Sequence, residues 1–242
     1  MHMVENVLVI GGYSDIAGSL INHLIEENTK VTILVHEDST PSYDSSNVDV
    51  VIGDATEEID VQKAVEISLQ NGPLDGIIHC VGSIVIRPPH AMKKEGFEEV
   101  ISTNLTSAFL ALSIGGKAML RSGGGRMVFC SSVAGSLGLV NHEAISAAKG
   151  GVESMVRSAA ATYAQRGLRI NAVAPGLTET KMASKILASD AMRDAAEAKI
   201  PLRRLNQKQE IAQTIYWLLT GAPDNFTGQV LHMDGGMSKI LV

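Results

Sequence analysis

The chain has 242 residues, of which 45% are hydrophobic and 19% are charged, a composition typical of one folded domain rather than of a disordered or repetitive protein. Its formal net charge of -6 leaves no basic footprint for nucleic acid or an anionic membrane surface, so a small-molecule partner fits better. No apolar run reaches the roughly 18 residues of a membrane span, and the N-terminal sequence lacks the basic start and cleavage site of a signal peptide. We therefore expect a cytoplasmic protein without membrane contact.

Short apolar runs rich in β-branched residues alternate with helix-length segments along the chain. The predicted strands are residues 7–10, 31–35, 48–52, 76–81, 126–130, 168–174 and 229–233. The predicted helices are residues 16–27, 60–71, 97–121, 144–166 and 209–219. Continuous apolar runs indicate strands buried on both faces. The pattern predicts a single domain, residues 1–242, with an α/β Rossmann-like fold: a doubly wound parallel sheet of about seven strands with helices on both faces.

The first predicted strand runs into the sequence IGGYSDIAGSL, residues 10–20. Gly11 allows a tight turn that brings backbone amides and a helix N-terminus to a pyrophosphate. We expect Asp15 to cap the helix through its carboxylate, and Ala17 is small enough for the helix to lie close to the strand. Taken alone, the stretch is equally compatible with a Gly-Gly turn that only joins a strand to a helix.

Two later strands end in residue types that suit a nucleotide pocket. Asp54 follows the third strand, where a carboxylate accepts a hydrogen bond from an adenine amino group. Gly82 follows the fourth, where a larger side chain would block a nucleotide. Each type is also common in turns. The two cysteines, Cys80 and Cys130, lack the spacing of metal ligands and are interpreted as small buried core residues, and His79 as a buried histidine with a satisfied hydrogen bond.

With these pieces in order, the chain resembles the short-chain dehydrogenase/reductase family over nearly its full length. The matching motifs are IGGYSDIA, GDA, HCVG, STNL, FCSSVAG, LRINAVAPGLTET and the tail at residues 201–236. The resemblance implies NAD or NADP as the cofactor, a small-molecule substrate and a homo-oligomer, either a dimer or a tetramer. The cofactor contacts it implies are Gly11, Tyr13, Ser14, Asp15, Ile16, His36, Asp54, Ala55, Val81, Gly82, Lys149, Pro175, Gly176 and Thr180.

The second predicted strand leaves the type of dinucleotide open. An acidic residue at its end would bind the ribose hydroxyls of NAD, whereas a basic one would favour the extra phosphate of NADP. Val35 stands at that place and His36 follows it. Glu37 and Asp38 would repel a phosphate if they faced it, and His36 is equally compatible with a plain surface histidine.

Carbonyl reduction requires a positioned hydride donor, groups that polarise the carbonyl oxygen and an acid that delivers a proton. In the family that the chain resembles, a Ser, a Tyr, a Lys four residues after the Tyr, and an Asn share these tasks. Ser132, Lys149 and Asn104 match the Ser, the Lys and the Asn. The tyrosine position, four residues before Lys149 and thirteen after Ser132, holds Ile145. Isoleucine cannot donate a proton, and loss of a general acid typically removes about 10²- to 10⁴-fold in rate.

His142 is the candidate replacement, because it lies three residues before Ile145 and shares a face with it if the helix extends that far. Alternatively, His142 only occupies the loop before the helix. Asn104 also fits a core amide, Ser132 a turn residue and Lys149 a surface lysine. Residues 176–200 stand where the family carries its substrate lid. Two functions stay open: an oxidoreductase with an altered proton donor, or a catalytically inactive dinucleotide-binding or scaffold protein of the same fold.

Overall fold

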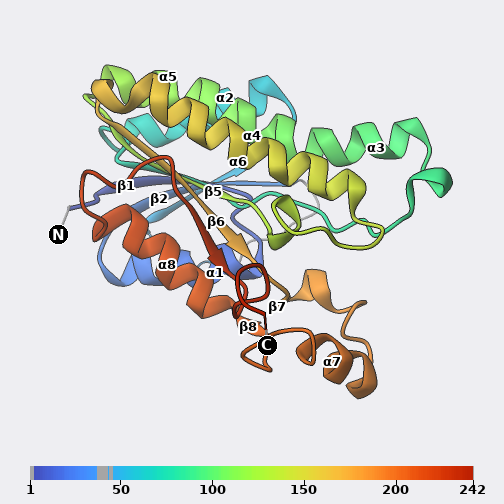
Figure 1. Cartoon of the computed structure of the whole chain (residues 1–242). Coiled ribbons are helices and arrows are strands. Elements are labelled where there is room, and N and C mark those ends of the chain that lie inside the picture. The colour runs from blue at the N-terminus through green and yellow to red at the C-terminus, as the bar shows by residue number, and fades with distance from the viewer. Residues whose placement is uncertain (1–2, 37–42, 44–45, 242) are drawn as a thin grey trace.

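The computed structural model describes residues 3–36, 43 and 46–241. Within them, a seven-stranded parallel sheet has the order β3-β2-β1-β4-β5-β6-β9 (Figure 1). Its strands are β1 Asn6–Ile10, β2 Lys30–Val35, β3 Val48–Ile52, β4 Gly76–His79, β5 Gly125–Cys130, β6 Leu168–Pro175 and β9 Val230–Met233. The strand order reverses between β1 and β4, which makes the carboxyl ends of these two strands the expected ligand crevice.

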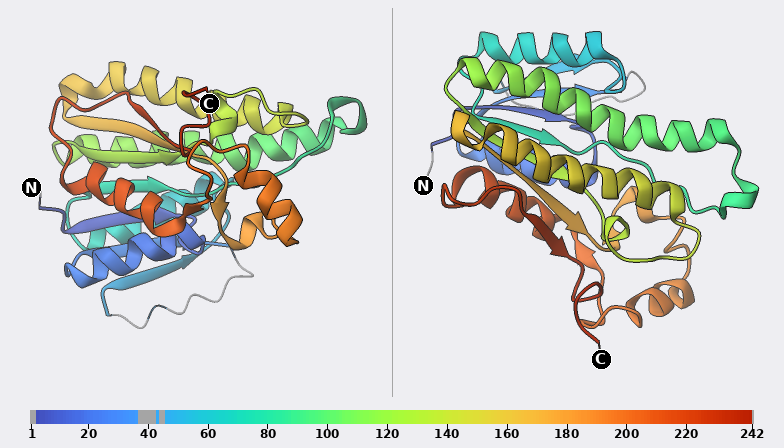
Figure 2. Two further views of the ribbon diagram at one scale, coloured as in Figure 1. Left: turned by 60° about the horizontal axis from the view of Figure 1, so that its bottom comes forward. Right: turned by 45° about the horizontal axis from the view of Figure 1, so that its top comes forward.

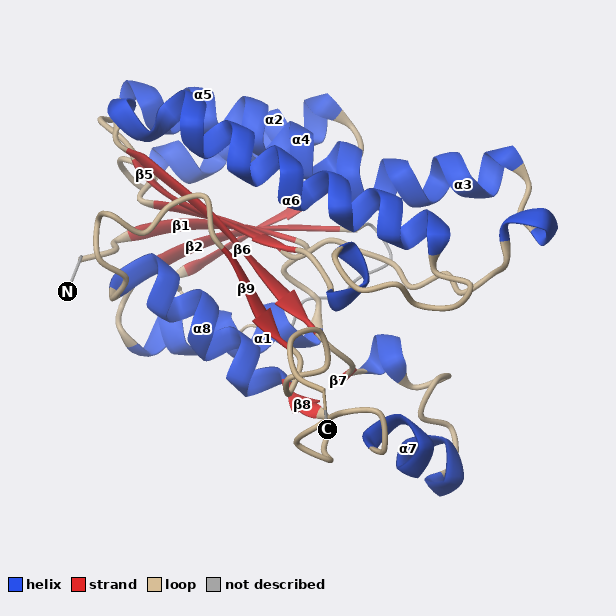
Figure 3. Ribbon diagram, in the orientation of Figure 1, coloured by secondary structure: helices blue, strands red, loops and turns tan. Residues whose placement is uncertain are grey.

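Helices cover both faces of the sheet (Figure 3), so the predicted doubly wound α/β fold is confirmed. One face is covered by α1 (Asp15–Glu26) and α8 (Lys208–Thr220). The other carries α2 (Glu58–Gln70), α3 (Lys94–Ile101), α4 (Ser107–Leu110), α5 (Gly116–Arg121) and α6 (Glu143–Tyr163). The segment expected as one helix at residues 97–121 contains two π-helical stretches, Ser102–Thr106 and Ala111–Gly115.

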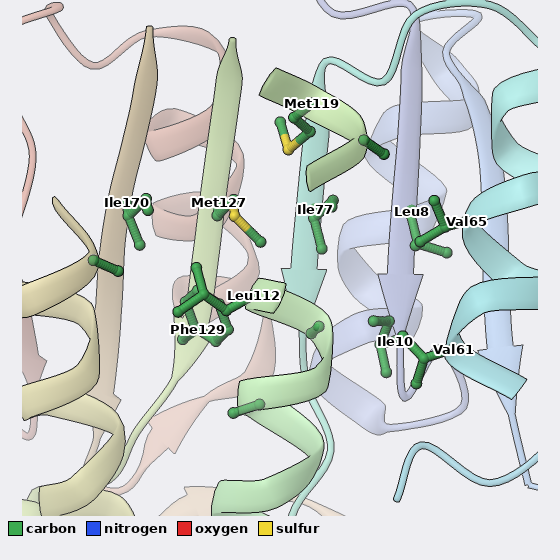
Figure 4. Close-up of a cluster of buried hydrophobic side chains, with 14 of the residues drawn as sticks. Leu8, Ile10, Val61, Val65, Ile77, Leu112, Met119, Met127, Phe129 and Ile170 are labelled. Carbon is green, nitrogen blue, oxygen red and sulfur yellow. The ribbon is translucent and has the colours of Figure 1, made fainter. Parts of the chain in front are cut away.

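Side chains of the central strands point alternately to the two faces of the sheet and so fill both layers of the core. Leu8 and Ile10 of β1 belong to a cluster beneath α2 and α4 (Figure 4), whereas Val7 and Val9 pack with α1 and α8 on the opposite face. The expectation of strands buried on both faces is wrong for β3. Val50 and Ile52 are 45% and 50% exposed, because β3 forms an edge of the sheet.

His79 ends β4, two residues before the predicted end of the strand. Its side chain is fully buried, and Nε2 lies 2.9 Å from the Ser107 hydroxyl. Across the described part of the chain Nδ1 finds no partner, so the expected hydrogen bond satisfies only one ring nitrogen. Burial, followed by the nearby charge of Lys149, lowers the pKa of His79 from 6.5 to about 3. The folded protein therefore holds this ring neutral.

The low pKa of His79 predicts that the folded protein is destabilised at acidic pH. Because its folded pKa lies below its unfolded value, the unfolded chain binds more protons below pH 6.5, and stability falls as the pH drops toward 3. Between pH 6.5 and about pH 5, the wild type should lose about 2 kcal/mol more free energy of unfolding than the His79→Gln variant. Urea unfolding at both pH values measures this difference, with the exposed His90 changed to Gln as the matched control. Equal losses in wild type and His79→Gln would contradict the assignment.

Candidate active site

The bend after β1 is held against β4. Gly11 has φ +84°, and a Cβ on it would lie 2.8 Å from the Val81 nitrogen and 2.9 Å from the Cys80 carbonyl carbon. Only glycine fits this position, so the tight turn expected there is present. Its N–H donates to the Leu34 carbonyl at 2.9 Å. Tyr43, which sequence analysis missed, donates its hydroxyl to the Gly12 carbonyl at 2.8 Å, and burial raises the pKa of Tyr43 to about 12.

Asp15 does not cap α1, contrary to the prediction. Ser14 is the N-cap, and its Oγ accepts from the Ala17 N–H at 3.2 Å. Asp15 is the first helical residue, and its carboxylate accepts from the Lys181 N–H at 2.7 Å and lies 3.6 Å from the Lys208 Nζ. The carboxylate thus ties the start of α1 to the segment after β6. Of the remaining predicted contacts in this turn, Tyr13 is exposed and Ile16 is half-buried.

A cavity of about 440 Å³ lies beside the ends of β2 and β3. It brings together four predicted cofactor contacts, His36, Asp54, Ala55 and Val81. The other lining residues are Leu34, Gly53, Thr56, Glu99, Ser102 and Thr103. Asp54 Oδ1 accepts at 2.8 Å from both the N–H and the hydroxyl of Thr56, which fixes the loop after β3. His36 is exposed, and Glu37 and Asp38 lie outside the described residues.

Lys149 and Asn104 converge on Gly82. A Cβ on Gly82 would lie 3.1 Å from the Asn104 Oδ1 and 3.2 Å from the Lys149 Nζ, so a side chain there would crowd both groups. Lys149 is only 6% exposed and is therefore not a surface lysine. Its Nζ donates to the Cys130 carbonyl at 2.8 Å. Burial lowers the pKa of Lys149, and the Cys130 and Cys80 sulfurs oppose that effect.

Asn104 is a fully buried amide in the first π-helical stretch. Its Oδ1 accepts from the Ser83 N–H at 3.1 Å, and its Nδ2 donates to the Val100 carbonyl at 2.9 Å and to the Ser83 Oγ at 3.0 Å. These bonds fasten the loop after β4 to the helical segment above it. Such wide helical turns often occur at functional sites, yet the hydrophobic periodicity gave no sign of one.

The two serines after β5 differ in their surroundings. Ser131 is buried, and its hydroxyl donates to the Glu153 Oε1 at 2.9 Å. Ser132 is half-buried at the end of the strand, where its Oγ accepts from the Ala134 N–H at 3.2 Å. Ser132 is thus the more accessible of the two serines. Sequence analysis missed the buried Glu153, whose only signal is an acid four residues after Lys149 on α6.

Ile145 is packed as a core residue. It is 5% exposed and belongs to an apolar cluster with Val100, Ala134, Ala144 and Ala148. Helix α6 begins at Glu143, so the condition under which His142 would share a helical face with Ile145 is not met. His142 is the N-cap residue, and its Nδ1 lies 2.7 Å from the Val140 carbonyl. Because a carbonyl only accepts, Nδ1 carries the proton of the neutral ring.

The segment after β6 forms the other wall of the crevice. The Gly176 N–H donates to the Met233 carbonyl at 2.9 Å, and the Thr180 Oγ1 lies 3.4 Å from the Thr178 carbonyl. Pro175 ends β6. Residues 176–200 include the short helix α7 (Asp190–Glu197), absent from the predicted elements, which stands apart from the two helical layers (Figure 2). The short strands β7 (Thr178–Glu179) and β8 (Asn206–Gln207) pair with each other on either side of α7 in the sequence.

Within the described ranges, no group of three His, Cys, Asp or Glu side chains is arranged to hold a metal ion. None of the helices in that part of the chain combines the length and the hydropathy that crossing a bilayer demands.

Comparison of the chain with known proteins identifies its family. The family model described as Enoyl-(Acyl carrier protein) reductase matches residues 14–238. The 3-oxoacyl-[acyl-carrier-protein] reductase FabG of Staphylococcus aureus is 31% identical over 98% of this chain and 99% of its own. A short-chain type dehydrogenase/reductase from Mycobacterium ulcerans superposes with a TM-score of 0.91 at 25% identity, covering 98% of this chain and 91% of that one. ElxO with NADP bound gives a TM-score of 0.87 at 25% identity, covering 97% and 99%. The chain therefore belongs to the short-chain dehydrogenase/reductase family and is an oxidoreductase of that type with a Rossmann NAD(P)-binding fold.

Proposed function

We propose that this protein interconverts a carbonyl compound and the corresponding alcohol, with NAD or NADP bound across the carboxyl ends of β1, β4, β5 and β6. The observation that carries the proposal is the buried Lys149 ammonium, which lies with the Asn104 amide beside Gly82 at the carboxyl end of the sheet. Burying the Lys149 ammonium costs free energy, and no carboxylate is among the groups that shift its pKa. Hydroxyl oxygens of a bound ligand would offset that cost.

The residues along the crevice fit a dinucleotide. The Gly11 bend leads into the N-terminus of the twelve-residue helix α1, which favours the negative charge of a pyrophosphate. At one end, the cavity beside Asp54 offers a carboxylate to an adenine amino group. At the other end, the Lys149 Nζ is positioned to donate to ribose hydroxyls. The dinucleotide would thus span the strand-order reversal.

The chain's own groups have separate tasks in this reaction. When bound, the nicotinamide supplies or accepts the hydride. Ser132 orients the substrate carbonyl and donates to its oxygen, where negative charge develops. Asn104 fixes the loop after β4 so that Gly82 stays open. Ile145 holds no proton to give, so the proton comes from His142 or from water, and we expect a rate about 10²- to 10⁴-fold below that of an enzyme with the tyrosine.

A second function is favoured by the packing of Ile145. Its side chain fills the tyrosine position as part of a buried apolar cluster with Ala134 and Ala148. This observation supports a catalytically inactive protein that binds a dinucleotide and acts as a sensor or scaffold. Both functions require the dinucleotide, and they differ in turnover.

Assembly and compartment follow the family resemblance. We propose a homo-oligomer, dimer or tetramer, in the cytoplasm. The exposed Phe97 and Phe109 on the segment of α3 and α4 support an interface between copies, because large aromatic side chains are enriched at such contacts.

The proposed crevice should bind a dinucleotide. Titration with NADH and NADPH, followed by nucleotide fluorescence, should give saturable binding of at least one of them. Lys149→Met should weaken that binding roughly tenfold or more, because charge-assisted hydrogen bonds are lost. Lys63→Met, at an exposed lysine of α2, is the control and should bind as the wild type does. Failure of both dinucleotides to bind would contradict both functions.

Restoring a tyrosine hydroxyl at position 145 should raise turnover. In an assay of ketones and 3-oxoacyl thioesters with the dinucleotide that binds, Ile145→Tyr should raise kcat by roughly 10²- to 10⁴-fold. Ile145→Phe, which adds the ring without the hydroxyl, is the matched control and should give no such gain. Turnover by the wild type that falls in His142→Ala would support the altered proton donor. Turnover by Ile145→Tyr with none by the wild type would instead support the inactive binding protein.

A further inference from the structure

The chain's two cysteines meet at the crevice. Cys80 directly follows β4 and Cys130 ends β5, and their Sγ atoms lie 3.4 Å apart. The parallel register pairs His79 with Phe129, so the next residues along each strand, Cys80 and Cys130, stand opposite one another. Neighbouring strands lie about 4.8 Å apart, which falls within the Cα separation of roughly 4.4–6.8 Å that a disulfide spans. A bond would require the sulfurs to approach by only about 1.3 Å.

The surroundings give the two sulfurs different roles. The hydrogen bond from Cys80, followed by the charge of Lys149, lowers the pKa of Cys130, whereas the pKa of Cys80 is raised well above its ordinary value. Cys130 is also partly exposed, and Cys80 is buried. Reactive cysteines combine thiolate character with access to solvent. Cys130 is therefore the sulfur that meets an oxidant, and Cys80 is the partner that closes the bond.

We propose that Cys80 and Cys130 form a redox-active dithiol, which hydrogen peroxide converts into a disulfide, and that the disulfide weakens dinucleotide binding. In the first step the Cys130 thiolate attacks a peroxide oxygen, so an S–O bond forms, the O–O bond breaks and hydroxide leaves. In the second step the Cys80 sulfur attacks the Cys130 sulfur, the S–S bond forms and the S–O bond breaks. The departing hydroxide takes the Cys80 proton as water. The thiol pair gives up two electrons, and the peroxide takes them.

The two groups proposed to bind the cofactor, the Gly11 bend and Lys149, both contact these cysteines. The Gly11 bend lies against the Cys80–Val81 peptide, with no space for a Cβ between them. The Lys149 Nζ is held by the Cys130 carbonyl. Because both supports include backbone atoms of the two cysteines, any strain from closing the disulfide acts directly on them. By linkage, a bound dinucleotide must then disfavour the disulfide to the same extent. This coupling rests on the proposed function, whereas the thiol chemistry does not.

The thiol chemistry is tested on the reduced protein by adding a small excess of hydrogen peroxide, then counting thiols and measuring the intact mass. Wild type should lose both thiols and two hydrogen atoms without gaining oxygen, and dithiothreitol should reverse the change. Cys80→Ser should instead gain one oxygen at Cys130, trapped by dimedone, because the closing thiol is absent. Two intact thiols in the wild type, or oxygen gained at Cys130 without a disulfide, would overturn the proposal.

The coupling is tested by titrating the oxidised and the reduced wild type with whichever of NADH and NADPH binds. We expect the Kd of the oxidised form to be roughly tenfold higher or more, and saturating dinucleotide to slow oxidation. Equal Kd values for the two forms would overturn the coupling. Thiol counting needs no cofactor, so the disulfide is established independently of the proposed function. If neither dinucleotide binds the reduced protein, the proposed function fails. If one binds both forms equally, only the coupling fails.

Discussion

The hydrogen bond from the Lys149 ammonium to the Cys130 carbonyl fixes a buried positive charge at the carboxyl end of the sheet. Several features follow from that charge. It contributes to the low pKa of His79, and it favours the thiolate of Cys130. It also explains why Gly82 carries no side chain, because a Cβ there would crowd the Nζ. No carboxylate is among the groups that shift the pKa of Lys149, which is why we propose that a bound dinucleotide supplies its missing partners.

The opposite wall of the crevice is tied to the first turn of α1. Asp15 accepts from the Lys181 amide and lies near the Lys208 Nζ, so one carboxylate connects the start of α1 to the segment after β6. In that segment, Glu179 binds Arg193 and accepts from the Gln207 side chain. These ion pairs and hydrogen bonds hold the segment that we propose as the substrate lid against α1 and β8.

Much of the fold was predictable, because the local pattern of hydrophobic residues indicates the alternation of strands and helices. The exposure of β3 was not, since it depends on which strand lies at the sheet edge. The π-helical stretches follow the same apolar face as an α-helix and leave no separate signal. In the site, Gly11 and Gly82 were identified from their positions after strands, and their crowded surroundings agree with that. The choice of Ser14 over Asp15 as the cap was not, because both residue types suit an N-cap and the sequence pattern does not separate neighbouring positions. The pairing of Cys80 with Cys130 likewise depends on strand register rather than on spacing.

The central claim is that one crevice grips a dinucleotide at the Gly11 bend and at Lys149. Crystals of the reduced protein soaked with NADH or NADPH test it most directly. We predict density that begins in the cavity beside Asp54, passes the start of α1 and ends with ribose hydroxyls on the Lys149 Nζ. A crevice that stays empty at saturating concentrations of both, or a dinucleotide seated on another surface, would contradict the account.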